Sequence, residues 1–271
     1  MSTFRNWVKQ HAFAIFLVLT FIISWSWYPL YLQGTVPLAV FPTGPLLAAL
    51  IVVSLAYGWN GIKEWLRTGF KWRVRPIWYV IAIGFPLALT GIPAAVNILL
   101  GATPSTAGYP ASIVDFLSEA AFVFVLVALG EEMGFSAFAL PHLLRRQPVL
   151  VTVAILGLTR SVWHLPLIMT GDTQWPVAIL LFPTQLIFTW IFIRSGGSAL
   201  MMVLSHMSIA TLGSTFFTNL FTGPELTRVV WLQAAAFVIA GIVLLLTSDF
   251  WRAGSYKRDP GLEDDLETAI P

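Results

Sequence analysis

Apolar runs of about 20 residues recur along the whole chain, and this repetition limits the fold more than any other feature. A helix needs about 20 apolar residues to cross roughly 30 Å of hydrocarbon. Only 10% of the residues are charged, against about 25% in soluble domains. The sequence therefore predicts an all-α polytopic membrane protein with about eight transmembrane helices enclosing an intramembrane polar cavity. Hydropathy places the spans near 12–33, 36–58, 77–100, 114–140, 149–170, 174–194, 197–219 and 229–250.

We expect a single transmembrane domain over residues 1–250, with its core at 114–219, and a polar cytoplasmic tail over 251–271. The first span is longer than the apolar part of a signal peptide and lacks a small-x-small cleavage site, so we expect it to be retained. With the N-terminus inside, 13 Lys and Arg residues fall on the cytoplasmic side and Arg228 alone falls outside. This asymmetry predicts cytoplasmic termini, and we expect a bacterial plasma membrane.

The connection at 59–76 combines basic and aromatic residues. It carries five cations, and its Trp65, Phe70 and Trp72 suit an amphipathic segment lying among the lipid headgroups. We therefore expect this connection to lie at the cytoplasmic surface.

Five ionisable residues lie well away from the ends of predicted spans, where an ionised group costs about 2.5–3.5 kcal/mol on insertion scales. The fourth span contains Glu131 and Glu132, the fifth contains Arg160 and His164 on one helix face, and the seventh contains His206. Adjacent residues point about 100° apart on a helix. We therefore expect that the two glutamates do not face the same spot, and that one acts while a partner holds the other. The structural alternative is an ion pair with Arg160 that only joins helices.

Carboxylates and imidazoles in one intramembrane pocket can activate water for peptide hydrolysis, directly or through a metal, while a second imidazole stabilises the oxyanion. Serine catalysis fits less well, because the surroundings of Ser136 resemble the rhomboid Gly-x-Ser motif only loosely. Aspartyl catalysis needs two aspartates in mid-membrane, whereas Asp115, Asp172 and Asp249 lie at span ends. The chain has no HExxH motif and no cysteine. A proton-coupled transporter could use the same residue types as a relay.

Three motifs in this order resemble the CPBP family of intramembrane proteases, which includes CAAX proteases and the bacteriocin-related Abi proteins. They are Glu131-Glu-Met-Gly-Phe with Phe138-Ala-Leu-Pro, then Ser161-Val-Trp-His-Leu-Pro, then Gly197-Ser-Ala-Leu with Ser205-His206. The resemblance extends from about Phe41 to the seventh span.

The resemblance implies a hydrolase with a distinct role for each matching residue. Glu131 would activate the attacking water, Glu132 would support it, His164 would orient the water, and His206 would stabilise the oxyanion or act as a further ligand. Family names often say metalloprotease, and Glu131, His164 and His206 would form a zinc set with an open position for water. Activation of water by Glu and His without a metal fits these residues equally well.

Two positions depart from the family pattern. Ser136 stands where the acidic motif usually has Arg, and Ala210 stands where the last motif usually has Asn. Arg160 replaces a frequent phenylalanine, so we hypothesise that the guanidinium has moved to the fifth span and pairs with Glu132. Ser208 or Thr211 would replace the missing Asn only if the helix rotates.

The sequence thus predicts an intramembrane endopeptidase of the CPBP type that acts on a membrane-associated peptide or protein. We expect the lipid bilayer and that substrate as partners, and no nucleic acid. Because two supporting residues are replaced, a catalytically silent scaffold or regulator is the main alternative, followed by the transporter.

Overall fold

The structure, a computed structural model, describes residues 2–252 as a bundle of helices. Eight helical stretches in this part of the chain are long and apolar enough to cross a membrane, which confirms the predicted all-α membrane fold. The expected polar tail was 251–271, and its residues 253–271 lie outside the described part of the chain. The spans are Ala12–Leu32, Gly44–Gly69, Ile77–Leu99, Ile113–Leu144, Val149–Thr170, Val177–Arg194, Ala199–Thr218 and Gly223–Thr247.

Several spans consist of more than one helical segment. The elements are α1 (Ser2–Gln10), α2 (Ala12–Trp25), α3 (Trp27–Leu32), α4 (Gly44–Gly69), α5 (Ile77–Leu99), the 3-10 turn η1 (Thr106–Gly108), α6 (Ile113–Phe122), the π-helical η2 (Val123–Ala128), α7 (Leu129–Gly134), the π-helical η3 (Phe135–Ala139), α8 (Leu140–Leu144), α9 (Val149–Trp163), α10 (Leu165–Thr170), α11 (Val177–Arg194), α12 (Ala199–Met207), the π-helical η4 (Ser208–Thr218) and α13 (Gly223–Thr247).

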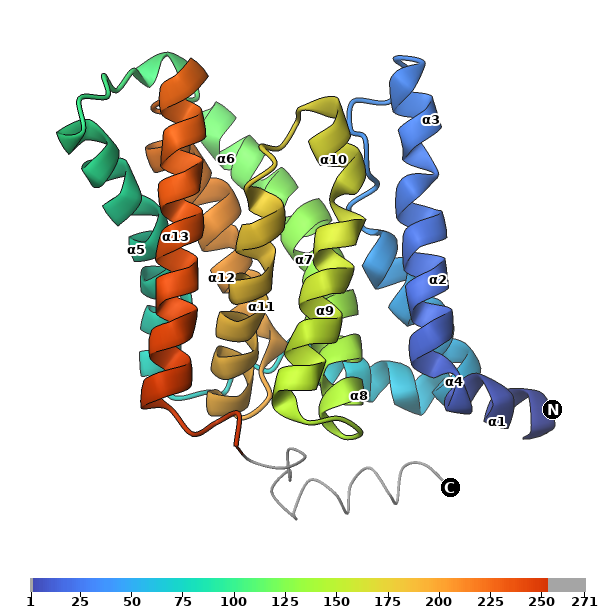
Figure 1. Cartoon of the computed structure of the whole chain (residues 1–271). Helices are drawn as coiled ribbons and strands as arrows, with labels where there is room; N and C mark the ends of the chain where they lie inside the picture. The colour runs from blue at the N-terminus through green and yellow to red at the C-terminus, as the bar shows by residue number, and fades with distance from the viewer. Residues whose placement is uncertain (1, 253–271) are drawn as a thin grey trace.

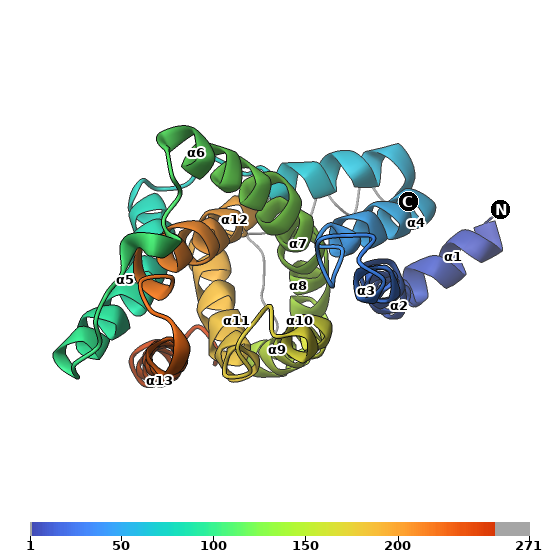
Figure 2. The same cartoon turned by 90° about the horizontal axis from the view of Figure 1, so that it is seen from above.

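The helices form a central group with others on both sides. Seen from above, α7, α9, α11 and α12 surround a common centre, while α5 and α13 lie on one side and α2 and α4 on the other (Figure 2). The described chain begins and ends at the same end of the bundle, the lower end of Figure 1. The central group includes the fourth, fifth and seventh spans, in which the ionisable residues were found, together with α11 of the sixth span.

The second span differs from its prediction at both ends. Residues 36–43 are not helical, since Pro37 and Pro42 interrupt the chain, and α4 begins at Gly44. The helix bends at Gly58, whose φ of 65° suits glycine, and its second part continues to Gly69 across the lower end of the bundle (Figure 1). The basic connection is therefore partly helical.

Two glycines let α7 lie directly against the start of α4. A Cβ on Gly134 would stand 2.5 Å from backbone atoms of Pro45, and one on Gly130 would stand 2.9 Å from the Cα of Thr43. Backbones in membranes approach closely where small residues face one another. This contact fixes the turn that carries Glu131 and Glu132.

Candidate active site

Glu132 is completely buried, and both of its carboxylate oxygens accept hydrogen bonds. Oε1 accepts from Arg160 Nη1 and from His206 Nδ1, each at 2.9 Å, and Oε2 accepts from Arg160 Nη2 at 2.6 Å. The hydroxyl of Ser136, one turn further along the helix, also donates to Oε2. Three helices therefore hold this carboxylate in one orientation.

Arg160 joins the acidic helix to α11. Its two Nη atoms form a bidentate pair with Glu132, and its Nε donates to Gln185 Oε1 at 2.9 Å. Its guanidinium carbon also lies 4.5 Å from the ring centre of Phe135. The pairing of Arg160 with Glu132 that we expected from the sequence is present. A bidentate pair of this kind fixes orientation as well as charge.

Glu131 lies in the same group but is bonded differently. Its side chain is buried, its Oε2 lies 3.6 Å from Arg160 Nη1, and this oxygen has no hydrogen-bond partner among the described residues. The expectation that the two glutamates do not face the same spot is therefore wrong, because their long side chains bring both carboxylates to Arg160. The expectation that a partner holds one of the two glutamates fits the contacts of Glu132, whereas the acting role of Glu131 stays a prediction.

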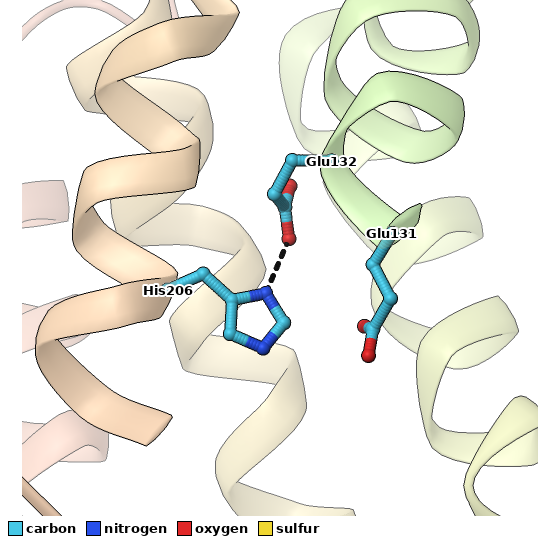
Figure 3. Close-up of side chains that lie close together, drawn as sticks. All are labelled: Glu131, Glu132 and His206. Atoms are coloured by element: carbon cyan, nitrogen blue, oxygen red, sulfur yellow. Dashed lines mark hydrogen bonds and ion pairs between the residues drawn. The ribbon is translucent and has the colours of Figure 1, made fainter. Parts of the chain in front are cut away.

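His206 points from α12 toward both glutamates (Figure 3). Because a carboxylate only accepts hydrogen bonds, Nδ1 carries the proton that it shares with Glu132, and Nε2 of the neutral ring is an acceptor. Glu131, Glu132 and His206 each offer one atom that could bind a metal ion, and these three atoms lie within 4.8 Å of one another. These three residues come from the fourth and seventh spans, as the sequence predicted.

His164 lies where α9 ends and α10 begins, just before Pro166. Its Nδ1 donates to the backbone oxygen of Arg160 at 2.8 Å, so Nε2 is again the acceptor. His164 is not a member of the close group of three. Its position is nevertheless tied to that of Arg160, whose side chain enters the group.

A metal ion at this site would meet a positive charge. The close group consists of Glu131, Glu132 and His206, whereas the set suggested by the sequence has His164 in place of Glu132. Both oxygens of Glu132 are already hydrogen-bonded, and Arg160 Nη1 lies 3.6 Å from the open oxygen of Glu131. Like charges repel strongly where water is excluded. These three potential metal ligands therefore fit a dication poorly.

The residues that could replace the missing Asn point elsewhere. The helix changes to the π-helical η4 after Met207, and Ser208 Oγ donates to the carbonyl of Ile83 at 2.6 Å. The hydroxyl of Thr211 lies 3.6 Å from the sulfur of Met207. Neither side chain takes the place of an amide at Ala210.

Sequence reasoning missed Gln185. Its Oε1 accepts from Arg160 and its Nε2 donates to Thr189 Oγ1 at 3.1 Å, all within the buried interior. An amide in the middle of the sixth span, two residues after Pro183, was the signal that could have identified it.

Fold and site together define an integral membrane protein with a buried Glu–Arg–His network shared by four of its helices. Residues 113–212 match the family model described as Type II CAAX prenyl endopeptidase Rce1-like. This match confirms the resemblance to the CPBP family, and it includes all five ionisable residues of the site. No curated protein matches the chain.

Proposed function

We propose that the protein is an intramembrane endopeptidase of the CPBP type, in which Glu131 activates the attacking water. The observation that carries this proposal is the buried Oε2 of Glu131, which accepts no hydrogen bond from the described residues, pairs with Arg160 only at 3.6 Å, and lies beside the imidazole of His206. A buried carboxylate oxygen without a donor is costly unless water or a substrate meets it. A water there would reach a base and an imidazole at once.

In this reaction Glu131 takes a proton from the water as its oxygen attacks the peptide carbonyl. His206 lies close enough to stabilise the oxyanion when its ring is protonated, or to orient the water when it is neutral. His164 supplies a second acceptor nitrogen from the end of α9. The proton held by Glu131 would then pass to the leaving amine.

Glu132 would be a supporting group. Three side chains already donate to it, so no oxygen is left to take a proton from water. Instead it fixes the ring of His206 through Nδ1, as carboxylates often do for functional histidines.

We propose that water activation proceeds without a metal. A dication bound to Glu131 would need negatively charged surroundings, but the positively charged guanidinium of Arg160 lies 3.6 Å from the Oε2 atom of Glu131. A chelator should then leave cleavage unchanged. Loss of cleavage in chelator, restored by zinc, would contradict this part of the proposal.

The substrate class that the family name suggests is a prenylated peptide, and we propose a membrane-associated peptide or protein of this general kind. The basic lower end would face the cytoplasm of a bacterial cell, in agreement with the distribution of Lys and Arg. Substrates would then enter from that half of the bilayer.

The test uses protein in lipid nanodiscs with two probes, a prenylated CAAX peptide and a library of membrane-inserted peptides. We expect the wild type to cleave at least one probe, and Glu131→Gln to lower the rate by about 10²–10⁴ because the base is lost. The matched control is Glu119→Gln on the exposed helix α6, which should keep full activity. Full cleavage by Glu131→Gln would refute the role of Glu131.

A catalytically silent scaffold is the second candidate, and one observation favours it. The hydroxyls of Ser208 and Thr211 are engaged elsewhere, so neither of these two replaces the donor missing at Ala210. Loss of one oxyanion donor costs about 10²–10³ in rate. Absence of cleavage of both probes by the wild type, together with an intact fold, would favour this candidate.

A further inference from the structure

The second part of α4 forms an exposed surface in which aromatic and basic side chains alternate. Between Gly58 and Gly69 the helix buries Trp65, Thr68 and Gly69. The opposite face exposes Trp59, Lys63, Leu66, Arg67 and Phe70, which repeat at helical spacing. The ammonium of Lys63 lies 5.8 Å from the ring centre of Trp59.

This face continues into the connection that leads to α5. Trp72, Arg73 and Arg75 are exposed there, and the guanidinium of Arg73 lies 5.0 Å from the ring centre of Trp72. The single acidic group between Trp59 and Arg75 is Glu64, which pairs with Arg67 at 3.6 Å. We call the exposed side chains of Trp59, Lys63, Arg67, Phe70, Trp72, Arg73 and Arg75 the basic–aromatic face.

The basic–aromatic face lies at the lower end of the bundle, the end that the Lys and Arg distribution predicts at the cytoplasmic surface of the bilayer. Helix α4 bends at Gly58 and the next span begins at Ile77, and the segment between them lies across the lower end of the bundle (Figure 1). Helix α1 lies at the same end, where Arg5 Nε donates to the carbonyl of Ala56 at 2.8 Å. Aromatic rings favour the headgroup level, and cations there attract anionic lipids.

The buried side of the same segment contacts the helix with the acidic pair. Trp65 Nε1 donates to the backbone oxygen of Met133 at 2.9 Å. Gly69 lies so close to Met133 that a Cβ would stand 2.4 Å from its sulfur. Met133 directly follows Glu132, so one short helix joins the basic–aromatic face to the candidate active site.

We propose that the basic–aromatic face binds the phosphate groups of anionic phospholipids, and that this binding steadies the turn of α7 with Glu131 and Glu132 through Trp65. A headgroup phosphate bound to Lys63 and Arg73 would favour packing of the amphipathic segment against the bundle. The contact of Trp65 and Gly69 with Met133 would then be held in place. The lipid contact does not depend on peptidase activity.

Lipid binding is tested with full-length protein in mixed micelles of phosphatidylcholine and phosphatidylglycerol, by native mass spectrometry. We expect phosphatidylglycerol to be preferred, and the double variant Lys63→Gln, Arg73→Gln to lose about fivefold in affinity for each cation removed. Added salt should weaken the wild-type preference. The matched control removes two cations elsewhere at the same end, as Arg194→Gln, Arg252→Gln, and should change little.

The coupling is tested by hydrogen exchange of residues 129–137 in nanodiscs. Phosphatidylglycerol should slow this exchange in the wild type but not in Trp65→Phe, which keeps lipid binding and loses the bond to Met133. Trp72→Phe serves as its control and should keep the slowing. Equal binding of both lipids, or equal losses in the two double variants, would overturn the lipid site. Exchange that is insensitive to the lipid in the wild type would overturn the coupling.

Discussion

The two halves of the fourth span lie in different surroundings although they form one continuous helical stretch. No residue of α6 is buried, whereas every residue from Gly130 to Leu144 is buried. Lipid tails are as apolar as leucine, so burial in a membrane protein reflects close packing and polar bonds rather than escape from water. The lower half has both, in its two glycines against α4 and in the network of Glu132. In the upper half, α6 buries no residue and contributes to no such buried network, so we expect the two halves to respond differently to substitution.

The largest difference should follow from removing Arg160 of α9, the cation that pairs with Glu132 in the lower half. Arg160→Ser leaves the buried charge of Glu132 uncompensated, and we expect a loss of about 3–5 kcal/mol in unfolding free energy. The measurement is denaturant-induced unfolding in detergent. The exposed pair between Arg67 and Glu64 supplies a control, since Arg67→Ser should cost no more than about 1 kcal/mol.

The same experiment tests whether the guanidinium can return to the fourth span. Ser136 already donates a hydrogen bond to Glu132 from one turn away, so the side chain of an arginine at position 136 would start close to the same carboxylate. Adding Ser136→Arg to Arg160→Ser should recover folding, and activity where cleavage is measurable. If the double variant is no better than Arg160→Ser alone, the proposed exchange of positions is wrong.

Matched leucines compare packing in the two halves directly. Leu140 is fully buried and Leu117 is 57% exposed. Leu140→Ala should cost about 2 kcal/mol or more, because the cavity it leaves is closed by protein. Leu117→Ala should stay within about 0.5 kcal/mol. Equal losses in thermal stability would mean that the upper half packs as tightly as the lower one.

Gln185 provides a smaller test of the network. Gln185→Met keeps the volume but removes the acceptor for Arg160 Nε, and we expect a cost of about 1.5 kcal/mol for the lost bond to a charged group. Thr189→Val removes only the neighbouring bond to the amide and should cost less. A cost for Thr189→Val that exceeds the cost for Gln185→Met would show that the amide does not act through Arg160.

The sequence predicted what depends on length and charge. The spans follow from apolar runs, so their number is confirmed and most of their limits lie close to the prediction. The partner of Glu132 followed from a second rule, that buried charges must pair, which left Arg160 as the cation within reach.

Features that depend on neighbouring backbone were not predicted. Nothing in the periodicity near Ala128 or Phe135 indicates a π-helix, because the change lies in hydrogen-bond register. Trp65 was expected among headgroups. It is instead buried and hydrogen-bonded to Met133, because it lies on the face of α4 that packs against the bundle. A neutral amide such as Gln185 does not reveal its partner, because many donors could satisfy it.

The smallest expected effect concerns the beginning of α6. Ser112 Oγ accepts from the backbone N–H of Asp115 at 3.1 Å and donates to its carboxylate at 2.8 Å, which caps the helix. Because α6 has no buried residue, we expect this cap to contribute much of the stability of its first turn. Ser112→Ala should cost about 1 kcal/mol, so amide exchange in residues 113–117 should rise about fivefold while the global unfolding midpoint stays unchanged. Ser118→Ala in the same helix should change neither. If Ser112→Ala lowers the global midpoint as much as Leu140→Ala does, the two halves unfold as one unit.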